Sequence, residues 1–126
     1  MKKKVLAVVM AATMIMGISL NASAATFSNV YLTTSQYSNY SGAVGDSSSV
    51  AVYALNNKSS KHNVKAITQA SRAGGSYYTI NTVSMGVGTV MSKKRLSGNP
   101  SDCSYRLQLN VVGVYKDCSA YGTIEL

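Results

Sequence analysis

The chain has 126 residues, with 12 lysine and arginine residues against 4 aspartate and glutamate residues, so its formal net charge at pH 7 is +8. A chain of this length supports one domain with one hydrophobic core. Four acidic residues, one histidine and two cysteines leave little material for acid–base catalysis or for a multi-cysteine metal site.

The first 24 residues have the three parts of a secretory signal peptide. Three lysines at positions 2–4 precede an uncharged run over 5–18, and small residues end the segment at 22–24. The run is shorter than the ~20 residues of a membrane-spanning helix, so cleavage is favoured over a transmembrane anchor. We expect a bacterial-type signal peptide over 1–24 and a secreted single domain over 25–126, with no transmembrane segment after cleavage. Losing the three lysines would leave this domain with a charge of +5.

The rest of the chain has the pattern of short strands. Segments rich in β-branched and aromatic residues alternate with Gly, Asn and Ser turns, and no stretch keeps a 3.6-residue period. We expect strands over 26–34, 50–55, 64–71, 76–85, 105–111 and 119–124, a further strand or bent continuation over 86–91, and a polar loop over 35–49. The pattern predicts an all-β fold, a small antiparallel β-sandwich or barrel of six to seven strands.

Three local features can be predicted within this pattern. The polar cluster over 56–63 is short enough to join the strands 50–55 and 64–70 as a hairpin. Lys93, Lys94 and Arg95 precede a Ser-Gly-Asn-Pro-Ser stretch, so we expect a basic loop there. Gly113 follows the regular alternation of 105–111 and predicts a bend.

The two cysteines, Cys103 and Cys118, enclose the strand over 105–111 and the expected bend. Thiols of exported proteins meet oxidising conditions, and two cysteines allow one intramolecular pairing. We therefore expect a disulfide that staples a chain reversal near the C-terminus and stabilises the domain by about 3 kcal/mol in the chain-entropy model. The alternatives are two buried thiols or bonds between chains.

Catalytic, metal and cofactor chemistry find little support in the sequence. His62 lies between Lys61 and Asn63 in the expected hairpin tip, where a histidine is usually solvated. A lone histidine does not complete a zinc site, and a Cys–His nucleophile would need a cysteine that we expect to be oxidised. We expect no enzyme activity, no metal and no cofactor, and a secreted hydrolase is the third candidate function.

Binding chemistry has more candidates. Two basic groups and two loop tyrosines could contact a partner, because lysine and arginine attract anions and tyrosine combines a flat apolar face with a hydroxyl. The candidates are Lys58, Lys61, Lys65, Lys93, Lys94, Arg95, Tyr37 and Tyr40. The plainer interpretation is that surface lysines keep the protein in solution. Strand tyrosines fill core margins in that interpretation, and we expect Tyr53, Tyr78 and Tyr105 in the core.

These observations favour an exported, non-enzymatic binding protein that acts at the cell envelope or an extracellular surface through a basic, tyrosine-containing face. We expect its partner to be an anionic cell-envelope polymer or another extracellular protein, and not nucleic acid, because a charge of +5 without a recognition motif is modest. In general build the chain is similar to small exported β-sandwich proteins of Gram-positive bacteria, including some bacteriocins, and no shared motif identifies a family. The alternative function is a secreted antimicrobial protein of the same fold.

Overall fold

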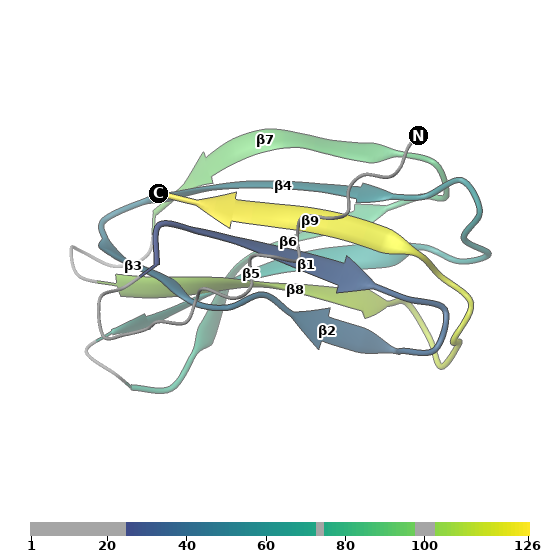
Figure 1. Ribbon diagram of the computed structural model, residues 1–126, viewed down its shortest axis with the longest axis horizontal. Helices are drawn as coiled ribbons and strands as arrows, with labels where there is room; N and C mark the ends of the chain where they lie inside the picture. The colour runs from purple at the N-terminus through teal and green to yellow at the C-terminus, as the bar shows by residue number, and fades with distance from the viewer. Residues whose placement is uncertain (1–24, 73–74, 98–102) are drawn as a thin grey trace.

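The computed structural model describes residues 25–72, 75–97 and 103–126, and shows an antiparallel β-sandwich (Figure 1). These residues form nine strands and no helix, which confirms the predicted all-β class, whereas the predicted number of six to seven strands is too low. The strands are β1 (Phe27–Leu32), β2 (Ser38–Tyr40), β3 (Val44–Ser47), β4 (Val50–Asn56), β5 (Val64–Arg72), β6 (Tyr78–Met85), β7 (Val90–Leu96), β8 (Cys103–Val111) and β9 (Ala120–Glu125).

The strands form two sheets that pack face to face. One sheet has four strands in the order β1-β9-β4-β7. The other has five, in the order β2-β8-β5-β6, and β3 also pairs with β8. The core lies between the two layers, as expected when each sheet buries one face.

Strict alternation in β8 explains how it lines this core. Every second residue from Cys103 to Val111 is buried, and the residues between them are partly exposed on the outer face. Tyr105 is fully buried, as predicted, and Tyr53 is half-buried. Tyr78 is 39% exposed, so its predicted core position is wrong. It lies on β6, an edge strand whose outer side chains meet water.

The predicted hairpin between 50–55 and 64–70 is wrong. β4 lies between β9 and β7 in the four-stranded sheet, and β5 lies between β8 and β6 in the other. The connection over 57–63 therefore crosses from one sheet to the other. Its composition is that of a turn, but turn composition does not say which sheet the next strand joins.

Two predicted loops contain strands. Lys93, Lys94 and Arg95 lie in β7, an edge strand, and not in a basic loop. Charged residues suit such a strand because they discourage edge-to-edge pairing with another molecule. The polar segment 35–49 contains the short strands β2 and β3, both paired with β8.

The predicted disulfide is also wrong. No bond joins Cys103 and Cys118, and both thiols are buried. Cys103 begins β8, and the chain reverses only after Val111, at the far end of that strand. Nine residues at a rise of ~3.4 Å carry β8 over roughly 27 Å, whereas bonded cysteines need Cα atoms about 5.5 Å apart. Cys118 lies beside the end of β8, too far from its beginning.

In the part of the chain that the structure describes, no helix is long and apolar enough to cross a membrane. The predicted signal peptide covers 1–24, outside the described residues.

Candidate functional site

Four connections meet at one end of the sandwich, on the right in Figure 1. Backbone hydrogen bonds join them: Val111 N–H donates to the Tyr37 carbonyl (2.8 Å), Val112 N–H to that of Asn63 (2.9 Å), Asn56 N–H to that of Thr89 (2.9 Å), and Asn57 N–H to that of Ser119 (2.9 Å). We call this region the loop end, defined as residues 33–37, 57–63, 86–89 and 112–119.

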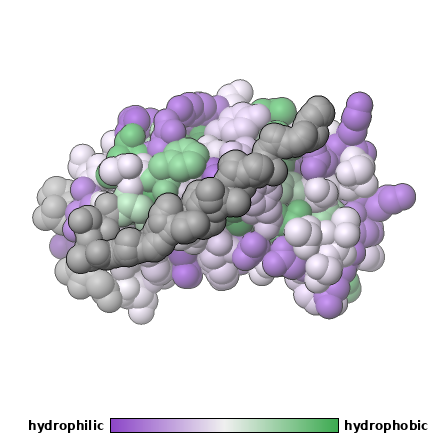
Figure 2. All heavy atoms as spheres, viewed as in Figure 1, coloured by the Kyte–Doolittle hydropathy of each residue, from purple (hydrophilic) through white to green (hydrophobic). Residues whose placement is uncertain are grey.

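The loop end combines exposed apolar side chains with lysines. Its exposed large apolar residues are Tyr37, Val87, Val112, Val114 and Tyr115, and its exposed lysines are Lys58, Lys61 and Lys116. Val114 is 81% exposed, the highest fraction among the large apolar side chains that the structure describes. Figure 2 shows hydrophilic side chains projecting at this end, with hydrophobic ones between them.

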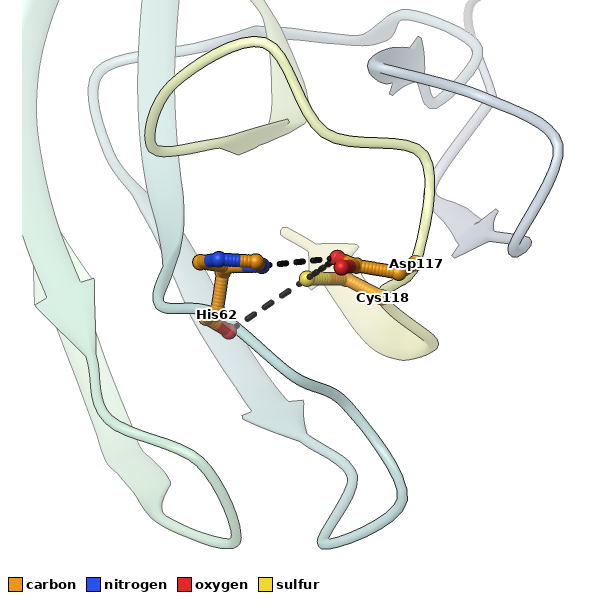
Figure 3. Close-up of side chains that lie close together, drawn as sticks. All are labelled: His62, Asp117 and Cys118. Carbon is orange, nitrogen blue, oxygen red and sulfur yellow. Dashed lines mark hydrogen bonds and ion pairs between the residues drawn. The ribbon is translucent and has the colours of Figure 1, made fainter.

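A cluster of three chemically active side chains lies within the loop end (Figure 3). His62 comes from the β4–β5 connection, and Asp117 and Cys118 come from the end of the β8–β9 loop. His62 Nδ1 lies 2.9 Å from Asp117 Oδ1. The Cys118 thiol donates to the His62 carbonyl oxygen (Sγ–O 3.3 Å) and lies 3.5 Å from Asp117 Oδ1.

Hydrogen bonds to backbone carbonyls hold this cluster from two sides. The N–H of Lys61 donates to the Asp117 carbonyl at 3.2 Å, which ties the two loops together directly beside the cluster. Below it, the buried Asn56 side chain donates through Nδ2 to the carbonyls of His62 and of Met85 in the other sheet, at 3.1 Å each. The backbone of His62 is therefore fixed from the core.

Tyr115 fixes the plane of the imidazole. Its ring lies parallel to that of His62, with centroids 3.6 Å apart and 4° between the planes. Gly113 makes this loop shape possible, because its φ is +104° and a Cβ there would lie 2.7 Å from the Tyr115 ring. The predicted bend at Gly113 is confirmed. His62 is not simply a solvated tip residue, because its ring stacks on Tyr115 and its Nδ1 hydrogen-bonds to Asp117.

The cluster lowers the pKa of Asp117. The main cause is the hydrogen bond from the His62 side chain, which partial burial opposes, and the Cys118 thiol and the charges of His62 and Lys61 add to the effect. Asp117 is therefore ionised at neutral pH and acts as an acceptor, so His62 Nδ1 carries the donated proton.

The geometry does not assemble a cysteine nucleophile with a base. The Cys118 sulfur faces the carbonyl of His62, and the Nδ1 of the imidazole is directed to Asp117. A thiol that an imidazole is to activate must lie within hydrogen-bond reach of a ring nitrogen. What the cluster does offer is one nitrogen, one oxygen and one sulfur atom within 4.8 Å of one another.

The residues predicted for binding fall into three places. Tyr37, Lys58 and Lys61 lie in the loop end, where Lys116 Nζ sits 4.7 Å above the Tyr37 ring. Tyr40 and Lys65 lie on the outer face of the five-stranded sheet, on β2 and β5. Lys93, Lys94 and Arg95 lie on β7, in the other sheet.

The β7 group is separated from the loop end. Val90 begins β7 beside Leu55 near the loop end, whereas Arg95 lies opposite Ala51, further along toward the other end. Lys93 pairs with Glu125 (2.6 Å), and Arg95 donates to Ser49 Oγ (3.0 Å). The basic residues predicted for binding are thus divided among the loop end, β5 of one sheet and β7 of the other.

The sequence did not predict several residues that the structure places beside the predicted contacts. Arg106 lies between the rings of Tyr40 and Tyr77, 4.1 and 4.0 Å from their centroids, on the outer face of the five-stranded sheet. Val114 and Tyr115 directly follow the predicted bend at Gly113 and are not among the predicted contacts. A signal existed in the run Val112-Gly113-Val114-Tyr115, because an apolar run beyond the end of a strand's alternation has no core face to fill.

No protein-family model, curated protein or solved structure matches the chain at a significant level. The functional interpretation therefore depends on the chemistry of the chain itself.

Proposed function

We propose that the chain is an exported, non-enzymatic binding protein that docks through its loop end on an anionic lipid surface of the cell envelope. The observation that carries the proposal is Val114, an apolar side chain that is 81% exposed and lies two residues before Lys116. Export rests on the signal-peptide pattern of residues 1–24.

Charge complementarity supports an anionic partner. Lys58, Lys61 and Lys116 project from the loop end, and the nearby carboxylate of Asp117 is already engaged by His62. Each lysine near an anionic membrane contributes about 1 kcal/mol of attraction, which salt screens.

The apolar side chains favour lipid over a purely polar polymer. Val87 projects from the β6–β7 connection, and Val112 and Val114 project from the β8–β9 loop. Both connections lie against the β4–β5 turn, since Gly88 lies beside Lys58 and Val112 N–H donates to the Asn63 carbonyl. Burial of one such side chain in a bilayer contributes up to about 1.5 kcal/mol. A soluble anionic polymer has no apolar interior that could accept these side chains.

Sedimentation of the secreted protein with lipid vesicles tests the proposal. We expect binding to vesicles that contain phosphatidylglycerol, little binding to pure phosphatidylcholine, and weaker binding at physiological than at low salt. Lys116→Glu should weaken binding about tenfold or more, and Val114→Asp should also weaken it.

Lys94→Glu on β7 is the matched control, since it makes the same charge change far from the loop end and should retain most of the binding. Equal binding to neutral vesicles, or equal loss in Lys116→Glu and Lys94→Glu, would contradict docking through the loop end. Binding to teichoic-acid-type polymers in place of vesicles would assign the surface to a polymer. Intact mass of the secreted protein tests export separately, and we expect a chain that begins at Ala25.

A secreted antimicrobial protein is the second candidate, because cationic and apolar side chains on one surface also suit attack on another cell's membrane. Growth inhibition of related bacteria by the purified protein would favour it. In that case Lys116→Glu should reduce inhibition and vesicle binding together.

A further inference from the structure

We infer that His62, Asp117 and Cys118 form a binding site for a divalent transition metal ion, principally zinc. The inference goes beyond surface docking and does not depend on it. It corrects the expectation that His62 lacks companion ligands, since the fold brings two other donors beside it.

The spacing of the donors is close to that of a metal site. In a tetrahedral zinc site with bonds of about 2.0–2.3 Å, neighbouring ligand atoms lie roughly 3–4 Å apart. Asp117 Oδ1 already lies 2.9 Å from His62 Nδ1 and 3.5 Å from Cys118 Sγ. All three atoms lie within 4.8 Å, so a small side-chain adjustment closes the set.

The donor types select the class of ion. A thiolate and an imidazole favour zinc and similar transition metals, whereas magnesium and calcium require mainly oxygen ligands. One sulfur, one nitrogen and one oxygen make three protein ligands, so a fourth position stays open to water or to an atom of a partner.

The site has both a rigid base and an access route. Cys118 is fully buried, whereas the side chains of His62 and Asp117 are 33% and 36% exposed. An ion can therefore reach the two partly exposed ligands from solvent, and it meets the buried thiol when it replaces the hydrogen bond between them. The stacked Tyr115 ring and the bonds to the His62 carbonyl restrict how far His62 can move.

Binding exchanges hydrogen bonds for metal bonds with a defined proton balance. Before binding, Cys118 carries its thiol proton and His62 Nδ1 donates to Asp117. On binding, the thiol proton passes to solvent and the imidazole proton moves from Nδ1 to Nε2. Bonds then form from the metal to sulfur, nitrogen and oxygen, with no change in oxidation state. We expect one proton released per ion from the neutral imidazole form.

Cobalt(II) titration of the reduced, metal-free protein tests the site, because cobalt reports its ligands optically. We expect saturation at one ion per chain, a thiolate-to-cobalt charge-transfer band in the near ultraviolet, and visible bands of tetrahedral strength. Zinc should displace cobalt and remove all of these bands. A weak octahedral spectrum without charge transfer in the wild-type protein would overturn the inference.

Matched variants assign the ligands. Cys118→Ser should abolish the charge-transfer band, and Cys103→Ser, which removes the other buried thiol at the far end of β8, should retain it. His62→Ala changes a partly exposed turn residue and should weaken cobalt binding at least tenfold. The same band in wild-type and Cys118→Ser, or unchanged affinity in His62→Ala, would exclude this site even if one variant folds poorly.

Vesicle binding measured with a chelator present separates this inference from the proposed function. If the wild-type protein binds vesicles but does not bind cobalt, only the metal site is refuted. Cobalt binding without vesicle binding would refute only the docking surface.

Discussion

The imidazole of His62 and the phenol of Tyr115 lie in parallel planes, with ring centroids 3.6 Å apart. His62 is the single histidine of the chain, so its ring protons give one resolvable set of NMR signals. We expect these signals upfield of the values in an unfolded peptide, because they lie within the ring current of Tyr115.

Tyr115→Leu should return the His62 signals toward the unfolded values, and Tyr115→Phe should keep them shifted. Loss of the stacked pair should also lower the free energy of unfolding by about 0.5–1 kcal/mol. Tyr37→Leu serves as the control, since its ring contacts Lys116. Unshifted wild-type signals would show that the stack does not form in solution.

The cysteines give a second prediction. Both side chains are fully buried, Cys103 at the start of β8 and Cys118 in the loop that follows the other end of that strand, so native protein should have the reduced mass and react slowly with alkylating reagents. In denaturant both thiols should react at once. Mass spectrometry after timed alkylation checks this, and recovery of an intramolecular disulfide in native protein would contradict the fold described for this strand.

Gly122 gives a third prediction, about how closely the sheets approach. It lies on β9, and a Cβ added there would be 2.7 Å from Leu107 Cδ2 on β8 and 3.2 Å from the Tyr53 carbonyl oxygen. Gly122→Ala should therefore destabilise the domain by about 1–3 kcal/mol. Gly86→Ala is the matched control, because its Cβ would meet only ordinary contacts, and it should change stability by about 0.5 kcal/mol or less. Urea unfolding measures both.

Tyr121 gives a fourth prediction, about alkaline pH. Partial burial raises its pKa above the usual 10.0, and the neighbouring Tyr31 and Tyr53 add to the shift. The folded state thus favours the protonated phenol. Its contribution to stability is complete below about pH 10 and is lost as pH rises through the folded pKa.

Wild-type stability should therefore fall relative to Tyr121→Phe as pH rises above about 10. At neutral pH the wild type should be slightly more stable, since Tyr121 donates to Asn29 Oδ1 at 3.2 Å. Unfolding curves from about pH 8 to about pH 11 measure the difference. A constant difference across this range would show that Tyr121 does not titrate differently in the folded state.

The sequence predicted where the strands lie along the chain better than it predicted which strands pair with one another in the sheets. Period-two alternation in 105–111 correctly predicted which side chains of β8 are buried, because alternation is a local property of the backbone. Pairing is not local: β9 separates β1 from β4, and β8 separates β2 from β5. The assumed hairpin and the assumed disulfide failed for this reason, since both required sequence neighbours to stay close in space.

The candidate site was harder to predict than the fold. Lys58, Lys61 and Tyr37 were chosen for charge and position, and the structure places them in one region. The meeting of His62 with Asp117 depends on the crossing of β4 to β5 and on the return of the chain after Gly113. The crossing leaves no mark in the local pattern, and the bend at Gly113, although predicted, does not say which loop the returning chain meets, so the one histidine looked isolated.

The buried amide of Asn56 links the two layers of the sandwich and resists their sliding against each other. Its Nδ2 bridges from β4 to the Met85 carbonyl of the opposite sheet and to the His62 carbonyl, where only 1% of the residue meets solvent. Sliding of one layer would break bonds that water cannot replace there, at a cost of about 1–3 kcal/mol for each orphaned group. The sandwich should therefore respond to a partner as a single rigid body, with adaptation confined to backbone rotations in the outermost turns.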